Sequence, residues 1–225
     1  MRSLLLLCVA GICLGAESDL DKARDRQDRP AMENIVAELR SAAGKSLKDA
    51  DAQYRVAVAY SYLAEVALEM RDKKQAQQAA ETGIQAADRA IALKPNVAEY
   101  HRVLATLCGQ VIPANVLAGM SYGKRAKDSI AKALELDPKS SNAYIAQGVG
   151  NYYMPAAFGG GVDPAIRDFK KSIELDPKSA DAYMWLGIAL RKARRNPEAR
   201  EAFQKSIQLN PNRIWAKQQL EKTPA

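Results

Sequence analysis

Apolar residues recur every three or four positions along most of the chain, which is the spacing of one face of a helix. Residues 49–71 and 73–93 carry this pattern over two long adjacent runs, and residues 30–44 carry it before them. The apolar positions of that first run are Met32, Ile35, Val36 and Leu39. Because Ala and Leu are frequent and Gly and Pro are rare inside the runs, the composition favours helices over strands. We therefore predict an all-α chain of about ten helices.

Four of these runs end in closely similar segments, and each segment closes on a proline. They are RAIALKP at Pro95, KALELDP at Pro138, KSIELDP at Pro177 and KSIQLNP at Pro211. The prolines are 43, 39 and 34 residues apart. Proline ends a helix because it lacks the amide hydrogen and clashes with the preceding turn. The chain is therefore predicted to consist of repeated helix pairs, two of them with insertions.

The last unit, residues 180–213, shows the repeat most clearly. Its first helix places large, apolar, small and large side chains in order, at Tyr183, Leu186, Gly187 and Leu190, and its second helix carries Ala199, Phe203 and Pro211. This pattern resembles the tetratricopeptide repeat (TPR), a helix-turn-helix unit of 34 residues. Gly187 and Ala199 are expected where two helices cross so closely that only a small side chain fits, with Phe203 beside them.

The resemblance implies an α-solenoid, in which stacked helix pairs bury a continuous core. It divides the chain into a signal peptide at 1–16, N-terminal capping helices at 17–48, a degenerate TPR-like pair at 49–97, a repeat with an insert at 98–140, a repeat with a glycine-rich insert at 141–179, a repeat at 180–213 and a C-terminal capping helix at 212–225. The inserts, including YYMPAAFGGGVDPAIRDF at 152–169, are similar to those of exported bacterial repeat proteins, of the T-component of tripartite solute transporters and of the repeat domain of microtubule-dynamics regulators.

The first residues are typical of a secretory signal, because Arg2 precedes an apolar run from Leu4 to Leu14 and the small residues Gly15 and Ala16 follow it. The run is far shorter than the roughly 20 residues of a membrane-spanning helix, so we expect cleavage near Ala16 and no permanent transmembrane anchor. The mature chain is predicted to be exported, periplasmic or secreted. Of the three cysteines, Cys8 and Cys13 would leave with the signal, and we expect the remaining Cys108 to be buried and inert.

No complete catalytic group is present in the sequence. The single histidine, His101, stands seven positions before Cys108, which is about 10 Å along one helix and too far for a nucleophile and its base. One histidine and one mature cysteine do not make a zinc site, and the glycines at 159–161 lack the neighbours of a phosphate-binding loop. We interpret them as a loop before a helix that Asp163 caps. The sequence predicts no enzyme, no metal and no cofactor.

The chain carries a net charge of +7, and the excess gathers late in the sequence. After Gly187 there are nine basic residues: Arg191, Lys192, Arg194, Arg195, Arg200, Lys205, Arg213, Lys217 and Lys222. Such a cluster attracts nucleic acid, anionic lipid or an acidic partner. Because export makes nucleic acid an improbable ligand, we favour a solvated outer face for these residues.

The residues left over from repeat packing indicate where a partner would bind. The first-helix positions that face the hollow of a TPR stack are Arg102, Thr106, Asn142, Ile145, Val149, Tyr152, Met184, Ile188 and Arg191. We expect this strip to bind a protein or peptide partner, acidic or amphipathic, and we leave oligomers open. The predicted function is a non-enzymatic exported scaffold. The alternative is an accessory periplasmic subunit of a transport or envelope complex, which would copurify with membrane proteins.

Overall fold

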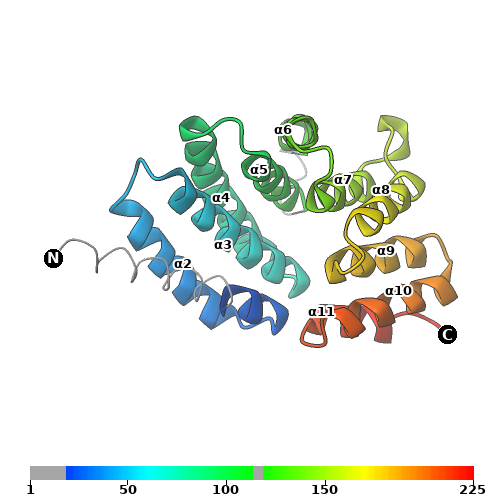
Figure 1. Cartoon of the computed structure of the whole chain (residues 1–225). Coiled ribbons are helices and arrows are strands. Elements are labelled where there is room, and N and C mark those ends of the chain that lie inside the picture. Colours follow the sequence, from blue (N-terminus) through cyan, green and yellow to red (C-terminus); the bar gives the residue numbers. More distant parts are fainter. Residues whose placement is uncertain (1–18, 114–118) are drawn as a thin grey trace.

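The computed structural model describes residues 19–113 and 119–225, and within them every regular element is helical (Figure 1). This confirms the predicted all-α class. The proposed signal peptide at 1–16 lies outside the described residues. Within the described part of the chain, no helix combines the length and the apolar character needed to cross a membrane.

Four antiparallel helix pairs form the body of the molecule, and single helices lie at its two ends. A short helical turn at residues 19–25 precedes α2 (Arg29–Gly44). The pairs are α3 (Ala50–Glu69) with α4 (Lys73–Leu93), α5 (Ala98–Val111) with α6 (Gly119–Leu136), α7 (Ser141–Tyr153) with α8 (Val162–Leu175), and α9 (Ala180–Lys192) with α10 (Asn196–Leu209). The 3-10 turn η1 (Ala156–Phe158) lies between α7 and α8, and α11 (Ile214–Glu221) follows the last pair.

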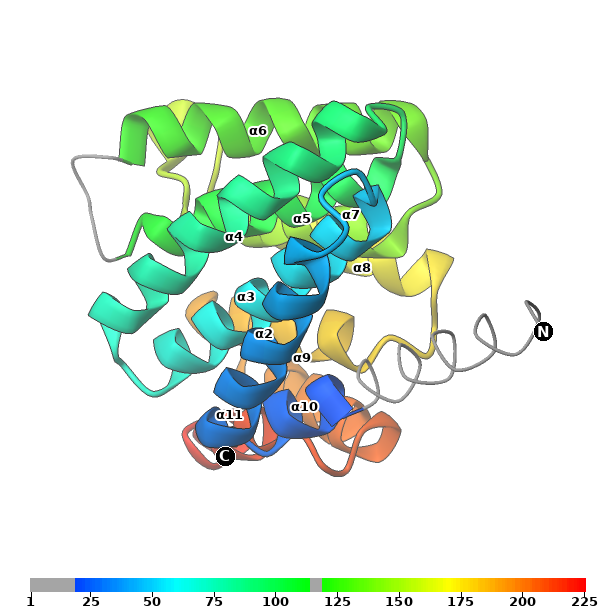
Figure 2. The ribbon, with the colours of Figure 1, turned by 90° about the vertical axis from the view of Figure 1, so that its left-hand side faces the viewer.

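The pairs stack in chain order, as a solenoid requires. The first helices of successive pairs touch, α3 against α5, α5 against α7 and α7 against α9, so they line one continuous inner face. The second helices lie outside them, and α6 crosses the top of the view in Figure 2. Helix α2 packs on α3, and α11 packs on α10. The predicted α-solenoid is therefore confirmed.

Short polar turns start most of these helices. Ser140 and Ser179, each in a DPKS turn, accept a hydrogen bond from the backbone amide three residues later, which satisfies one free donor of the first turn. The prediction that Asp163 caps α8 is wrong, because α8 begins at Val162 and its N-cap is Gly161. The φ angle of Gly161 is 118°, which only glycine adopts readily, and this sharp turn starts the helix two residues early.

Two large buried clusters hold the stack together. One joins residues 19–25 to α2, α3, α4 and α5 and is rich in alanine. The other joins α8, α9, α10 and α11 and is built around Phe169 and Phe203. A Cβ atom on Gly187 would lie 2.7 Å from the Phe203 ring, and one on Gly148 would lie 2.5 Å from the Phe169 ring. Ala199 is fully buried, so the close crossing predicted for the last pair is present.

Candidate functional site

Helices α5 and α7 lie side by side and carry most of the predicted inner-face residues. On α5, Arg102 is half-buried and its Nε donates to Glu99 Oε1 over 2.6 Å, while the hydroxyl of Thr106 donates to the Arg102 carbonyl. Tyr54 of α3 also donates to Glu99, over 3.3 Å. The guanidinium at the centre of this face is thus neutralised by one carboxylate of its own helix.

Helix α7 contributes a polar and an apolar part to the same face. Asn142 is exposed, whereas Ile145 and Val149 are half-buried and lean on the C-terminal core cluster. Tyr152, at the end of the helix, lies with its ring 6.3 Å from that of Trp185 and 4.1 Å from the Lys192 ammonium. These contacts leave part of each apolar side chain accessible. We name Arg102, Thr106, Asn142, Ile145 and Val149 together the inner α5–α7 face.

The three predicted residues on α9 have a different position. Met184 and Ile188 are buried in the C-terminal core cluster, and the Arg191 guanidinium donates to the carbonyl and the side-chain oxygen of Gln219. We expected an open hollow at these positions. Helix α9 is the first helix of the last pair, and α11 contacts it through Arg191 with Gln219 and through the rings of Trp185 and Trp215. Partner binding at these three residues remains a prediction.

A buried group of charges that the sequence pattern did not reveal connects the first helix pair with the last one. Arg213, in the turn before α11, has 0% exposure and pairs with Glu65 at 2.7 Å and with Glu69, both on α3. Arg24, in the helical turn at 19–25, pairs with Asp181 of α9 at 2.9 Å and lies over the Tyr62 ring. The first and last helix pairs are therefore joined across the hollow.

Hydrogen bonds donated by side-chain amides add to the same junction. The Asn210 amide donates to Asp25 over 2.7 Å, and Gln27 donates to Glu69 over 2.8 Å. The Gln218 amide, in α11, donates to Gln27 over 3.2 Å. In Figures 1 and 2 the helical turn at 19–25 lies beside α11. We name residues 19–28 together with Glu65, Glu69, Asp181 and Arg213 the closing junction.

Burial changes the acidity of the junction carboxyls. It raises the pKa of Glu69 to about 7, although the Arg213 charge acts in the opposite direction. Burial also opposes ionisation of Asp181, but Arg24 and Arg213 outweigh it and hold the pKa of Asp181 below its ordinary value. The pKa of one junction carboxyl is therefore raised, and the pKa of another is lowered.

The prediction that all nine late basic residues form a solvated outer face is wrong for three of them. Arg213 is buried in the closing junction, Arg191 bonds α11, and Arg200 donates to the Thr223 carbonyl over 2.7 Å. The sequence around Arg213, NPNRIW, looks like an ordinary turn, and the carboxylates that pair with it lie some 150 positions away in sequence. Only the fold brings them together.

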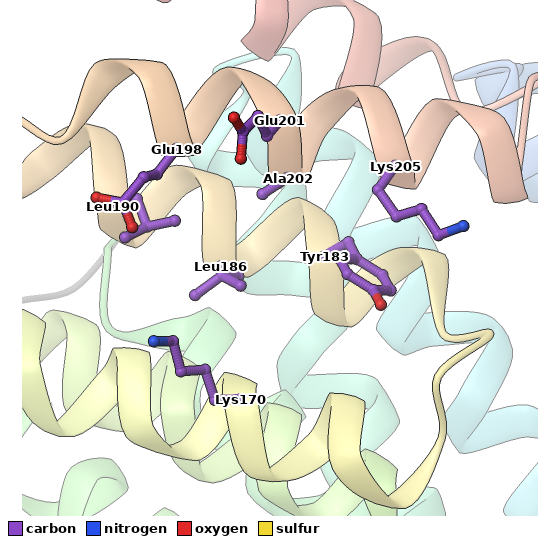
Figure 3. A pocket seen from close by; sticks show the side chains of 8 residues that line it. All are labelled: Lys170, Tyr183, Leu186, Leu190, Glu198, Glu201, Ala202 and Lys205. Carbon is purple, nitrogen blue, oxygen red and sulfur yellow. The ribbon is translucent and has the colours of Figure 1, made fainter.

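A second concavity lies on the outer side, between α8 and α10 with α9 as its floor (Figure 3). It has a volume of about 310 Å³ and is lined by Lys170, Tyr183, Leu186, Leu190, Glu198, Glu201, Ala202 and Lys205. Figure 3 shows lysine and glutamate side chains around an apolar floor. Of the two carboxylates that line this cleft, Glu198 is paired with Arg195, which is not among the lining residues.

Neither His101 nor Cys108 takes part in a reactive group. His101 Nε2 lies 2.7 Å from the Pro95 carbonyl, and Cys108 is buried in the N-terminal cluster. Burial raises the pKa of the Cys108 thiol to about 11, so the nucleophilic thiolate is scarce at neutral pH. Among the described residues, no group of histidine, cysteine and carboxylate side chains is arranged to hold a metal ion.

Two family models match the chain in succession. The model described as regulator of microtubule dynamics protein 1-3 matches residues 17–155, and a tetratricopeptide repeat model matches residues 157–214. A comparison with curated proteins found no match.

Several solved structures share the fold. A thermophilic TPR protein of Thermus thermophilus, TTC0263, is 16% identical with a TM-score of 0.62, and the match covers 92% of this chain and 99% of that one. The HusA haemophore from Porphyromonas gingivalis is 20% identical with a TM-score of 0.55, covering 76% and 93%. At such low identities these likenesses show the arrangement of helices and nothing more.

Proposed function

Because the chain belongs to the regulator of microtubule dynamics protein 1-3 family and is built from tetratricopeptide repeats, we propose that it is a non-catalytic scaffold for a partner protein. The partner would bind on the inner α5–α7 face. One observation carries this proposal: Met184, Ile188 and Arg191 are taken up by the core and by α11, whereas the predicted inner-face residues of α5 and α7 keep part of their side chains accessible. What remains accessible there is a mixture of apolar and polar side chains, which suits a protein segment.

The chemistry of this face indicates the kind of segment. Ile145 and Val149 offer apolar surface, and Asn142 offers an amide that both donates and accepts hydrogen bonds. Arg102 is held by Glu99, so an acidic side chain of the partner would compete with Glu99 for the same guanidinium. We therefore propose an amphipathic segment with an acidic residue near Arg102. Tyr152, at the end of α7, would extend the contact toward the insert.

Site-specific photocrosslinking tests this assignment. Benzoylphenylalanine placed at Asn142 should trap a discrete partner in the native host, because that side chain is exposed on the inner face. The matched control is the same group at Glu174, which is exposed on the outer helix α8. With the trapped partner purified, Ile145→Ser combined with Val149→Ser should weaken binding about tenfold. Equal adducts from both positions, or unchanged affinity in the double variant, would place the site elsewhere.

Export is the second part of the proposal, and the sequence of residues 1–16 supports it. Microtubules are cytosolic filaments, so an exported member of this family would serve a different partner from the one that the family description names. Mass spectrometry of the protein from its host should find a mature N-terminus near Glu17. Retention of residues 1–16 in the cytosol, together with salt-resistant cosedimentation with microtubules, would favour a microtubule partner instead. Stable copurification with membrane transport subunits would favour the envelope-complex alternative.

A further inference from the structure

The insert between α7 and α8 projects from the stack at the end where the helices of each pair are joined (Figure 1). Residues 152–162 contain no charged side chain. The backbone nevertheless folds back on itself, because Gly161 donates to the Asn151 carbonyl over 2.8 Å and Phe158 donates to the Pro155 carbonyl over 2.9 Å. A Cβ atom at Gly160 would lie 2.3 Å from the Met154 carbonyl oxygen, so only glycine fits this return. The insert is therefore an apolar projection with a defined backbone fold.

Two aromatic side chains point outward from this projection. Tyr153 is 62% exposed and Phe158 is 74% exposed, and Pro155, Ala156 and Ala157 beside them are also exposed. A large side chain left this open in a folded protein marks an interaction surface when apolar neighbours surround it. The projection spans only the 11 residues 152–162, fewer than the roughly 20–30 residues that each side of a specific protein interface usually contributes.

A basic side chain contacts the start of the insert, and two more follow it in sequence. The Lys192 ammonium donates to the Tyr152 carbonyl over 3.1 Å, which ties the end of α9 to the start of the insert. Arg194 and Arg195 follow in the α9–α10 turn, and all three are exposed. Arg195 pairs with Glu198 at 2.5 Å, and Asp163, exposed directly after the insert, is a further negative charge near Arg195. Three basic residues against these two carboxylates leave one positive charge in excess.

We infer that this projection, Tyr153 and Phe158 with Lys192 and Arg194, docks the protein reversibly on an anionic lipid bilayer. Aromatic and apolar side chains enter the headgroup region, and flanking lysine and arginine side chains bind the negative headgroups. The positive charge beside the tip is complementary to that surface, whereas a neutral or acidic border would oppose it. This surface lies at the turns of the helix pairs, so the inner α5–α7 face would stay free for its partner.

Vesicle cosedimentation tests the inference with the chain that begins at residue 17, because the apolar run at 4–14 would bind lipid by itself. All the helices described above begin after residue 17, so this chain contains them. The probe is a set of phosphatidylcholine vesicles with about one third phosphatidylglycerol, compared with pure phosphatidylcholine. The chain should bind the anionic vesicles and bind the neutral ones at least about fivefold more weakly, and added salt should reduce binding. Tyr153→Ser combined with Phe158→Ser should lower binding to the anionic vesicles about fivefold or more.

Two matched variants distinguish docking through the insert from nonspecific binding by any exposed apolar side chain. Leu47→Ser combined with Leu93→Ser removes exposed apolar side chains, 66% and 40% accessible, at the opposite end of the helix pairs and should leave binding unchanged. Arg194→Asn removes one charge and fits the φ angle of 62° at that position, so it should weaken anionic binding without disturbing the turn. Absence of vesicle binding, an equal loss in the Leu47 and Leu93 variant, or an effect of the aromatic variant only on binding to a protein would each overturn the inference.

Discussion

The α3–α4 and α9–α10 pairs each pack side chains tightly against a glycine, but those side chains come from different places. In α9–α10 the small residue and the large one that fills the gap, Gly187 and Phe203, belong to the same pair. In α3–α4 a Cβ atom at Gly83 would meet Tyr60 of the same pair and Leu107 of α5. The α9–α10 crossing is therefore encoded within one repeat, whereas the α3–α4 crossing depends on the next pair. Packing that involves three helices leaves a weaker local pattern in the sequence.

The two regions are also recognised by different family models, whose matches adjoin at residues 155 and 157. The closing junction connects them, because Arg213 of the C-terminal region is buried against Glu65 and Glu69 of the N-terminal region. In an open solenoid each repeat contacts only its neighbours, so its two ends unfold with some independence. A closed stack should behave as one unit. The following predictions test how the packing of the two regions differs and whether the closing junction joins them.

Replacing Arg213 should have the largest effect. Arg213→Met leaves Glu65 and Glu69 close together and buried without their cation, which should lower the free energy of unfolding by about 3–5 kcal/mol. The control is Lys217→Met on the exposed side of α11, which should change stability by less than about 0.5 kcal/mol. Chemical denaturation measures both. Equal stabilities would mean that the junction contributes little.

The same junction should make stability depend on pH. The folded-state pKa of Glu69 is raised to about 7, so the protonated form is favoured by folding. Its contribution is fully present below the ordinary pKa of 4.5 and is lost as pH rises through 7. We expect the free energy of unfolding to fall by on the order of 3 kcal/mol between about pH 5 and pH 8. Glu69→Gln should flatten this profile, and an unchanged slope in that variant would assign the effect to another group.

The glycine crossings should show the next largest effect. Gly187→Ala places a Cβ against the buried Phe203 ring, over which Arg191 also lies, and should cost about 1–3 kcal/mol. Gly109→Ala on α5 is the control, because no atom lies within 4 Å of its added Cβ. That variant should gain about 0.5–1 kcal/mol from helix propensity. Thermal melting in the opposite order would show that close packing does not select glycine at position 187.

The smallest effect concerns Cys108 in the N-terminal cluster. Because burial raises its pKa to about 11, the native protein should react with iodoacetamide at pH 8 far more slowly than an unfolded chain does. Mass spectrometry of the labelled protein gives the rate. Labelling at the rate of a free thiol would show that the N-terminal region opens often.

Local patterns were enough to predict the solenoid and the last repeat. The four proline-ended segments and the order of Tyr183, Leu186, Gly187 and Leu190 are properties of consecutive residues, so they appear in the sequence. The closing junction was not predicted, because Arg24 meets Asp181 only after the whole stack has curved. Arg213 stands in the turn before α11, and no periodic sequence pattern predicts the partner of a turn residue.

The candidate site was predicted only in part for the same reason. The TPR pattern indicated which side of each first helix faces inward, and on α5 and α7 the accessible residues are among those predicted. It did not reveal that α11 bonds Arg191 and that Met184 and Ile188 are buried in the core. Helices that cap a solenoid fold back by tertiary contacts, so the last repeat loses its open face.

The most direct test of the closed stack is denaturant unfolding followed by one probe in each region. Both tryptophans, Trp185 and Trp215, lie in the C-terminal cluster, so their fluorescence reports that region, while the reactivity of Cys108 reports the N-terminal one. If the closing junction unites the regions, the two probes give coincident transitions in the natural chain, and the transitions separate in Arg213→Met. Separate transitions in the natural chain would contradict the account, because the two regions would then unfold as independent units.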